Sequence, residues 1–299
     1  MDGHGGTPEA NLSIFGAASR DMRRLRRVLG IIVRHGFGGV FTRNAVGRRF
    51  LKEADVMASG DGPSPSAQGL RRLIEELGPT YIKLGQILSM RTDIVPPEYI
   101  EALSSLQDQA PSVDVDVVRH RIESDLGAPI DKLFASFDTK PLATASIAQV
   151  HRATTLDGHS VVVKVQRPGI EEVLRSDLDL LFMLAKFLEA NIEEMKVIAP
   201  VEIVLEFENA LLRELNFGEE MSNLLKARGY LTKERSVVVP KPFPELSCRT
   251  VLTMEYFPGQ SLRKVPTPSP LASKAALELA HSFCKQILVD GFFHADPHA

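Results

Sequence analysis

One lysine interrupts a run of β-branched residues in the middle of the chain. Lys164 lies between Val163 and Val165, within the segment Val161–Val165. A buried ammonium group needs an anionic partner, because an unpaired charge in apolar surroundings is strongly disfavoured. Such a lysine can bind the phosphates of a nucleotide while it pairs with a glutamate from a nearby helix. The alternative is a lysine on an edge strand whose side chain points to water.

A loop of small residues precedes this strand. Its sequence, Ala143-Thr144-Ala145-Ser146, allows a backbone to approach a phosphate closely, and the Ser146 hydroxyl can donate a hydrogen bond. Alanine adopts positive φ less readily than glycine. We therefore expect a stiffer loop than a glycine-rich phosphate loop, one that holds nucleotide differently. Taken alone, the segment is also compatible with a simple turn of small residues.

An aspartate near residue 299 is a candidate for proton transfer. Asp296 follows the apolar residues Ile287–Val289 and Phe292–Phe293, which can anchor the loop that carries it. A carboxylate held in this way suits a base or a group that orients a hydroxyl nucleophile. The alternative is a metal site formed with His294 and His298.

Two further sets of polar residues lie on predicted helices. Glu214 falls within a helical pattern, where exposed acidic residues are common. Lys83 and Gln86 share one helix face at i and i+3, and Gly85 between them permits close packing. No physical rule makes these residues catalytic, and an ordinary amphipathic helix explains them equally well.

The elements around these candidates predict an α+β protein. Helical patterning runs from Ala67 to Leu126 with a break at Pro96-Pro97. Two strand-like runs then meet at Asp157-Gly158, a dipeptide typical of hairpins. The strands of this hairpin, and the helices and strands that follow, are predicted at Ile147–Thr155, His159–Gln166, Glu171–Lys196, Val201–Arg228, Ser236–Val239, Arg249–Tyr256 and Ala272–Val289.

A basic segment precedes the helical region. Between Arg20 and Lys52 ten lysines and arginines face one acid, Asp21, and four apolar side chains recur with helical spacing. These are Leu25, Val28, Leu29 and Ile32. A basic amphipathic helix can lie on an anionic membrane. The alternative is a helix that docks on its own protein and leaves its basic face in solvent.

Composition excludes several classes of protein. The chain has 299 residues, of which 44% are hydrophobic and 24% charged, with a net charge of −3. This profile predicts a globular protein with no bulk charge for nucleic acid. The two cysteines, Cys248 and Cys284, indicate neither a disulfide framework nor a zinc site and fit a reducing cytoplasm. No apolar run is long enough for a membrane span, and no signal peptide is evident.

Five motifs in one order resemble the UbiB/AarF family of atypical protein-kinase-like proteins. The first is K-x-G-Q, at Lys83, Gly85 and Gln86. The second is an Ala-rich loop that ends in S-I-A-Q-V-H, at Ser146–His151, and the third is V-x-V-K-V-Q-R-P-G, at Val161–Gly169. The fourth, E-L-D-[FY]-x-x-E-x-x-N, is matched by Glu214, Leu215, Phe217, Glu220 and Asn223. The fifth is H-A-D-P-H, at His294–His298.

The resemblance implies a protein-kinase-like fold and a role for each matching residue. Lys164 would contact ATP phosphates and pair with Glu214, and Asp296 would be the catalytic aspartate. The backbone of Glu255 and Tyr256 would bind adenine. Ala143, Ala145 and Ser146 would cover the phosphates, and Lys83 and Gln86 would occupy the cleft in place of a peptide substrate.

Composition and the resemblance together predict a division into segments. Residues 1–19 are predicted to be disordered, and 20–65 to form the basic helix and a linker. Residues 66–135 would be the helical K-x-G-Q extension and 136–260 the small lobe. Residues 261–299 would begin a large lobe that is incomplete in this chain.

Two departures from the family pattern stand out. Asn216 replaces the aspartate of E-L-D, which puts coupling to metal or nucleotide there in doubt. The chain stops at Ala299, before the asparagine and the D-F-G aspartate that hold Mg²⁺ in kinases. No metal ligand is therefore expected in this chain, which we expect to be a truncated form with impaired catalysis.

The implied function is ATP-dependent chemistry, as an ATPase or small-molecule kinase that supports coenzyme Q and prenyl-lipid metabolism. Expected partners are ATP with Mg²⁺, an anionic membrane surface, prenyl-lipid intermediates and lipid-biosynthesis enzymes, in the cytoplasm or peripherally at the inner membrane. One alternative is a non-catalytic pseudokinase or lipid-associated scaffold. Another is a phosphotransferase of the aminoglycoside-kinase type, which leaves Lys83–Gln86 unexplained.

Overall fold

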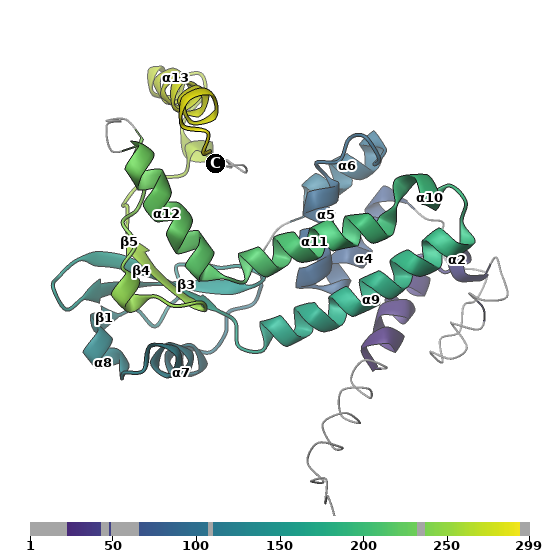
Figure 1. Ribbon diagram of the computed structural model, residues 1–299, viewed down its shortest axis with the longest axis horizontal. Helices are drawn as coiled ribbons and strands as arrows, with labels where there is room; N and C mark the ends of the chain where they lie inside the picture. Colours follow the sequence, from purple (N-terminus) through teal and green to yellow (C-terminus); the bar gives the residue numbers. More distant parts are fainter. Residues whose placement is uncertain (1–22, 43–47, 49–65, 107–109, 232–236, 294–299) are drawn as a thin grey trace, which may run out of the picture. The chain divides into compact units, whose positions relative to one another are not determined.

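The computed structural model describes residues 23–42, 48, 66–106, 110–231 and 237–293 (Figure 1). These residues form two compact units. A helical unit combines the chain up to Ala110 with Gly169–Ala210, and a sheet-containing unit combines Pro111–Pro168 with the chain from Leu211. The mixture of helices with an antiparallel sheet confirms the predicted α+β class.

The sheet is antiparallel and has the strand order β1-β3-β4-β5, with β2 paired to β3. The predicted hairpin is confirmed, and Gly158 adopts a φ of +84° in its turn. The strand predicted at Ser236–Val239 does not form in its described part, residues 237–239. The prolines at 240 and 242 remove backbone donors from this segment. The strands are β1 (Phe134–Phe137), β2 (Ala143–Thr144), β3 (Ala148–Thr155), β4 (Ser160–Gln166) and β5 (Val251–Glu255).

The core of this unit lies on one face of the sheet. Alternate residues of β4, Val161, Val163 and Val165, are at most 1% exposed and pack against α7 (Val115–Leu126) and α8 (Ile130–Leu133). Figure 1 shows these two helices on that side and α12 (Phe217–Leu231) on the other. Because side chains alternate along a strand, Lys164 belongs to the face opposite the valines.

The chain from α11 onward differs in part from the predicted helices. The helix predicted over Val201–Arg228 is instead two helices, α11 (Pro200–Glu214) and α12, separated by Leu215-Asn216. The predicted helix at Ala272–Val289 is α13 (Pro270–Lys285), followed by a π-helical turn, η3 (Gln286–Asp290). Ser269 caps α13, since its hydroxyl accepts from the backbone N–H of Ala272.

The helical unit is built around the helix of residues 23–34. The other helices of the unit are α2 (Gly39–Thr42), α4 (Ala67–Leu77), α5 (Pro79–Leu88), α6 (Pro97–Ser104), α9 (Ile170–Asn191), α10 (Met195–Ile198) and the first part of α11. Gly85 of α5 packs so closely that an added Cβ would lie 2.5 Å from Leu106. The close packing expected at this glycine is therefore confirmed.

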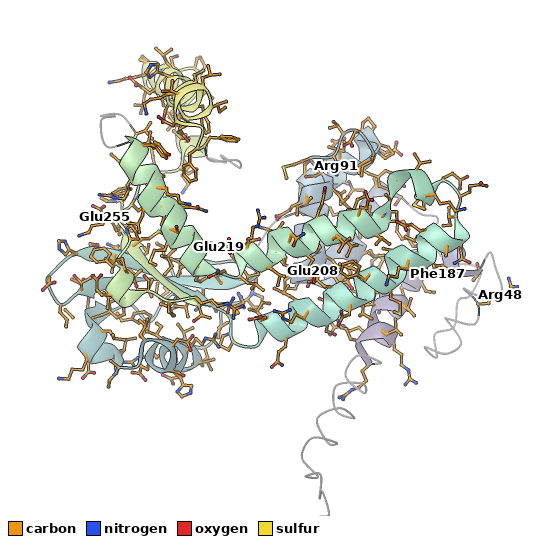
Figure 2. All side chains as sticks on the ribbon, viewed as in Figure 1. Arg48, Arg91, Phe187, Glu208, Glu219 and Glu255 are labelled. Atoms are coloured by element: carbon orange, nitrogen blue, oxygen red, sulfur yellow. The ribbon has the colours of Figure 1, made fainter. Side chains whose placement is uncertain are left out.

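The apolar face of the basic helix packs on its own chain. Val28 and Leu29 are fully buried, and Leu29 contacts Phe187 of α9, whose side chain is labelled in Figure 2. The apolar face of this helix therefore docks on its own protein, which was one of the two predicted alternatives. Arg23, Arg26 and Arg27 of the same helix are exposed. Among the described residues, no helix is long and apolar enough to cross a membrane.

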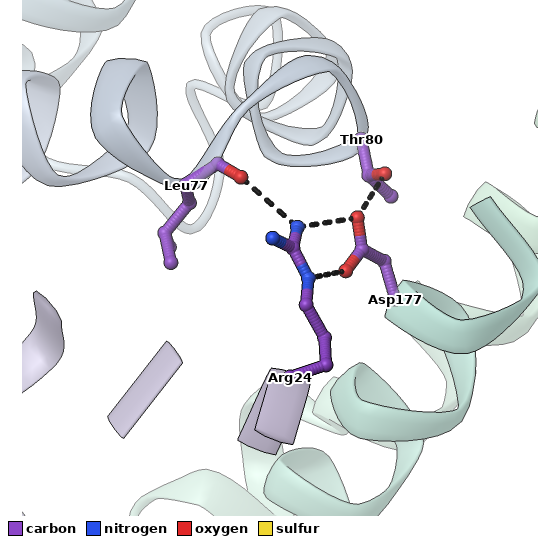
Figure 3. Close-up of polar contacts among 4 residues, drawn as sticks. All are labelled: Arg24, Leu77, Thr80 and Asp177. Atoms are coloured by element: carbon purple, nitrogen blue, oxygen red, sulfur yellow. Dashed lines mark hydrogen bonds and ion pairs between the residues drawn. The ribbon is translucent and has the colours of Figure 1, made fainter. Parts of the chain in front are cut away.

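A largely buried ion pair and its hydrogen bonds join four helices of this unit (Figure 3). Arg24 Nε and Nη2 donate to the two carboxylate oxygens of Asp177 on α9 at 2.7 and 2.9 Å. Thr80 Oγ1 at the start of α5 donates to the same carboxylate at 2.6 Å, and Arg24 Nη2 also donates to the carbonyl of Leu77. Asp177 therefore fixes the first turn of the K-x-G-Q helix against α9.

Candidate active site

Lys164 lies on a central strand. It is opposite Val150 of β3 and Leu252 of β5, so β4 has a partner on both sides. The edge-strand alternative is therefore wrong. The side chain is 23% exposed, which leaves the ammonium group accessible from the face that α12 flanks.

The anionic partner of Lys164 is Glu220. Lys164 Nζ donates to Glu220 Oε2 at 2.7 Å and lies 4.7 Å from the centroid of the buried Phe217 ring. The expected pairing with Glu214 is wrong, because Glu214 ends α11 and the chain turns at Leu215-Asn216 before α12 begins. Glu220 is 38% exposed, so the pair lies at the edge of solvent.

The start of α12 explains why Glu220 takes this place. Asn216 Oδ1 accepts from the backbone N–H of Gly218 at 3.1 Å, and its amide donates to Glu219 Oε1 at 3.2 Å. An asparagine with a glutamate three residues later is a helix-start signal, and it could have located this break from the sequence. Carboxylates in the first turn are also favoured by the helix dipole.

Gln166 anchors this junction to the sheet. Its Nε2 donates to the carbonyl of Leu215 at 3.1 Å, and both residues are buried. The side chain thus links the end of β4, two residues after Lys164, to the turn that precedes Glu220. The distance between the two charged partners is set partly through this amide.

We expect Gln166→Leu to destabilise the chain, because it leaves the buried Leu215 carbonyl without a donor. Such a loss costs roughly 1–3 kcal/mol. Urea unfolding followed by circular dichroism measures it. Gln68→Leu, on the exposed side of α4, is the matched control and should change stability by less than about 0.5 kcal/mol. Equal effects of the two substitutions would refute the anchoring role.

The small-residue loop forms a tight hairpin between β2 and β3. Ala145 N donates to the carbonyl of Ala148 at 2.8 Å, and none of the loop residues has a positive φ. Ala143 is exposed, whereas Ser146 is only 4% exposed. The Ser146 hydroxyl therefore offers little surface to a ligand in this conformation.

The segment expected to bind adenine follows directly from β5. The backbone N–H of Glu255 donates to the carbonyl of Lys241, and that of Tyr256 donates to the carbonyl of Ser160. An adenine here would have to use carbonyl groups of the segment or N–H groups further along. Arg152 lies over the Tyr256 ring at 4.2 Å, and the Glu255 side chain is labelled in Figure 2.

The remaining candidates are not among the described residues of the sheet-containing unit. Lys83 and Gln86 are on α5 in the helical unit, where Gln86 Nε2 donates to the carbonyl of Leu106 at 3.4 Å. Their role in a cleft stays a prediction. Asp296, His294 and His298 lie outside the described residues.

The donor set around Lys164 fits a polyphosphate. It combines a half-buried ammonium group, whose position is fixed by one carboxylate, with a hairpin of small side chains that leaves its outer surface open at Ala143. Phosphate recognition by a lysine point charge needs this kind of accessible, oriented ammonium. Within the described ranges, no three histidine, cysteine or acidic side chains gather in a way that could hold a metal ion.

Comparison with known proteins agrees with this geometry. Residues 105–299 match the ABC1 atypical kinase-like domain. A probable protein kinase UbiB of Marinobacter nauticus is 39% identical over 236 residues, covering 77% of this chain and 42% of the relative. One from Aliivibrio fischeri is 33% identical over 288 residues, covering 93% and 52%. The chain spans about half the length of the curated relatives it matches.

A solved structure from Mycobacterium tuberculosis, that of Rv3197 in complex with erythromycin, is also similar. It shares 28% sequence identity with this chain and has a TM-score of 0.41. The match covers 64% of this chain and 48% of the other.

Proposed function

Because this chain belongs to the family of ABC1 atypical kinase-like proteins, we propose that its sheet-containing unit binds ATP on the face that carries Lys164. The observation that supports this most is the ion pair between Lys164, on the central strand β4, and Glu220 of α12. Lys164 Nζ lies 2.7 Å from Glu220 Oε2. Glu220 holds the ammonium group in one orientation. The conformational entropy of this long side chain is therefore lost before the nucleotide binds, and less is lost on binding.

Each part of the site has a proposed task. Lys164 neutralises phosphate charge, the hairpin at Ala143–Ser146 covers the phosphates, and Glu255-Tyr256 lies beside the adenine. Asp296 is proposed to orient the acceptor hydroxyl. ATP would supply a phosphoryl group for transfer to water or to a small-molecule hydroxyl, and Mg²⁺ would offset the charge of the phosphates. The described residues contain no cluster of ligands for the metal ion.

We place this activity in ubiquinone and prenyl-lipid metabolism, as the names of the UbiB relatives suggest. The helical unit then acts as the K-x-G-Q extension that excludes a peptide substrate. The exposed arginines Arg23, Arg26 and Arg27 support electrostatic contact with an anionic membrane. This contact is proposed to be peripheral, because the apolar face of their helix is buried in the protein.

Titration calorimetry of the chain with ATP, with and without Mg²⁺, tests the proposal. We expect saturable binding at one site. An absence of binding, together with retention on anionic liposomes, would instead favour a non-catalytic scaffold. Turnover of a hydroxylated antibiotic in place of a lipid precursor would favour the aminoglycoside-kinase type.

A further inference from the structure

Three polar side chains of the strand motifs take no part in the contacts of Lys164. Gln149 and His151 on β3 are at most 1% exposed, and Arg167 follows β4 directly. Buried polar groups in folded proteins are almost always hydrogen-bonded. Among the described residues, their partners include the turn of the small-residue hairpin and the segment of residues 111–113.

Arg167 holds the hairpin at two points. Its Nε donates to the carbonyl of Ala145 at 2.8 Å, and its backbone N–H donates to the carbonyl of Ile147 at 2.9 Å. Its Nη2 donates to the carbonyl of Pro111 at 2.8 Å. One guanidinium group therefore joins the hairpin turn to the segment that leads into α7.

Gln149 makes a second link to that segment. Its Oε1 accepts from the backbone N–H of Val113 at 2.7 Å, and its Nε2 donates to the carbonyl of Val113 at 3.2 Å. The same Nε2 lies 2.9 Å from His151 Nε2, and His151 Nδ1 lies 2.8 Å from the carbonyl of Asp138. A carbonyl can only accept, so Nδ1 carries the proton and Nε2 accepts from Gln149. Burial lowers the pKa of His151, which agrees with a neutral ring.

We propose that Arg167 and Gln149 are positioning residues for the hairpin of residues 143–147, which they hold in one frame with residues 111–113. This deepens the proposed ATP site and rests on it. No glycine occurs between Pro141 and Asp157, so the hairpin lacks the backbone freedom of a glycine-rich loop. Side chains fix it in place before the nucleotide binds, and a preformed loop lowers the entropy lost on binding.

Hydrogen exchange of the full chain, followed by mass spectrometry, tests the frame without nucleotide. In Arg167→Gln we expect the amides of residues 141–147 to exchange roughly tenfold faster, since two hydrogen bonds are lost. Exchange in α7 and β5 should stay unchanged. ATP affinity should fall by about the same factor while the urea midpoint moves little.

Two further variants keep the test decisive. Arg167→Lys retains the charge and can reach one carbonyl, so it should recover part of the protection and of the affinity, and it serves if Arg167→Gln does not fold. Arg175→Gln, which breaks an exposed ion pair with Glu171, is the matched control and should change neither.

The outcomes separate the two proposals. Unchanged exchange at 141–147 in Arg167→Gln, or acceleration spread evenly over the sheet, would overturn the positioning role even if ATP binds normally. If the wild-type chain binds no ATP, the proposed function fails. In that case, hydrogen exchange of residues 141–147 still tests whether Arg167 positions the hairpin.

Discussion

Lys164→Ala is expected to lower the ATP affinity of the chain by roughly 100-fold, because hydrogen bonds to charged groups contribute about 1.5–3 kcal/mol each. The substitution removes the ammonium group that Glu220 orients, and it leaves the buried valines of β4 on the opposite face. Fold stability should therefore change little. Titration calorimetry with ATP and a urea unfolding curve measure the two quantities on the same preparation.

Two comparison variants make this result specific. Lys132→Ala removes an exposed lysine from α8 in the same unit and should leave ATP affinity unchanged. Glu220→Gln keeps the ammonium group but removes the charge that orients it, so we expect a smaller loss than for Lys164→Ala. Wild-type affinity in Lys164→Ala would exclude the sheet face around this residue as the phosphate site.

The second large effect is expected in the helical unit. Asp177→Asn removes the charged partner of Arg24, and breaking a buried pair in this way costs roughly 3–5 kcal/mol. Asp177 has no exposed surface, so water cannot replace the lost carboxylate charge. Burial by itself would lower the pKa of Arg24, but its hydrogen bond and charge interaction with Asp177 raise it above the usual value. Arginine is not deprotonated in proteins, so in the variant its charge remains and loses the carboxylate that balances it.

Thermal and urea unfolding measure this loss. Arg34→Gln, which breaks the exposed pair with Glu76, is the control and should cost at most about 1 kcal/mol. The double variant Arg24→Met with Asp177→Leu should recover part of the stability, since apolar replacements of a buried pair are often neutral or stabilising. The recovery stays incomplete because Thr80 and the Leu77 carbonyl lose their partners. A loss in Asp177→Asn no larger than in Arg34→Gln would contradict the structural role of the pair.

Local patterns were enough to predict the central hairpin. The β-branched residues of β4 and the turn at Asp157-Gly158 carry their signal within a few positions, so both strands and the position of Lys164 followed from the sequence. β1 and β2 escaped prediction because they have four and two residues and depend on pairing with β3. Short strands of this kind have no periodicity of their own.

The partners of charged residues could not be predicted in the same way. Arg24 and Asp177 are 153 positions apart, and no local spacing indicates that they meet. For Lys164 the family pattern led us to predict Glu214 as the partner, whereas the structure gives Glu220, because the helix breaks between these two residues. The cap at Asn216 carried that information, but the helical periodicity across it suggested one continuous helix.

The most direct test of the ATP site is photolabelling of the chain with 8-azido-ATP, followed by peptide mapping and competition with ATP. The azide is attached to the adenine ring, so it reports where the base lies. We expect the label on the peptide that contains Glu255 and Tyr256, and we expect Lys164→Ala to reduce it strongly. Competable labelling confined to residues 66–106 of the helical unit would contradict the account.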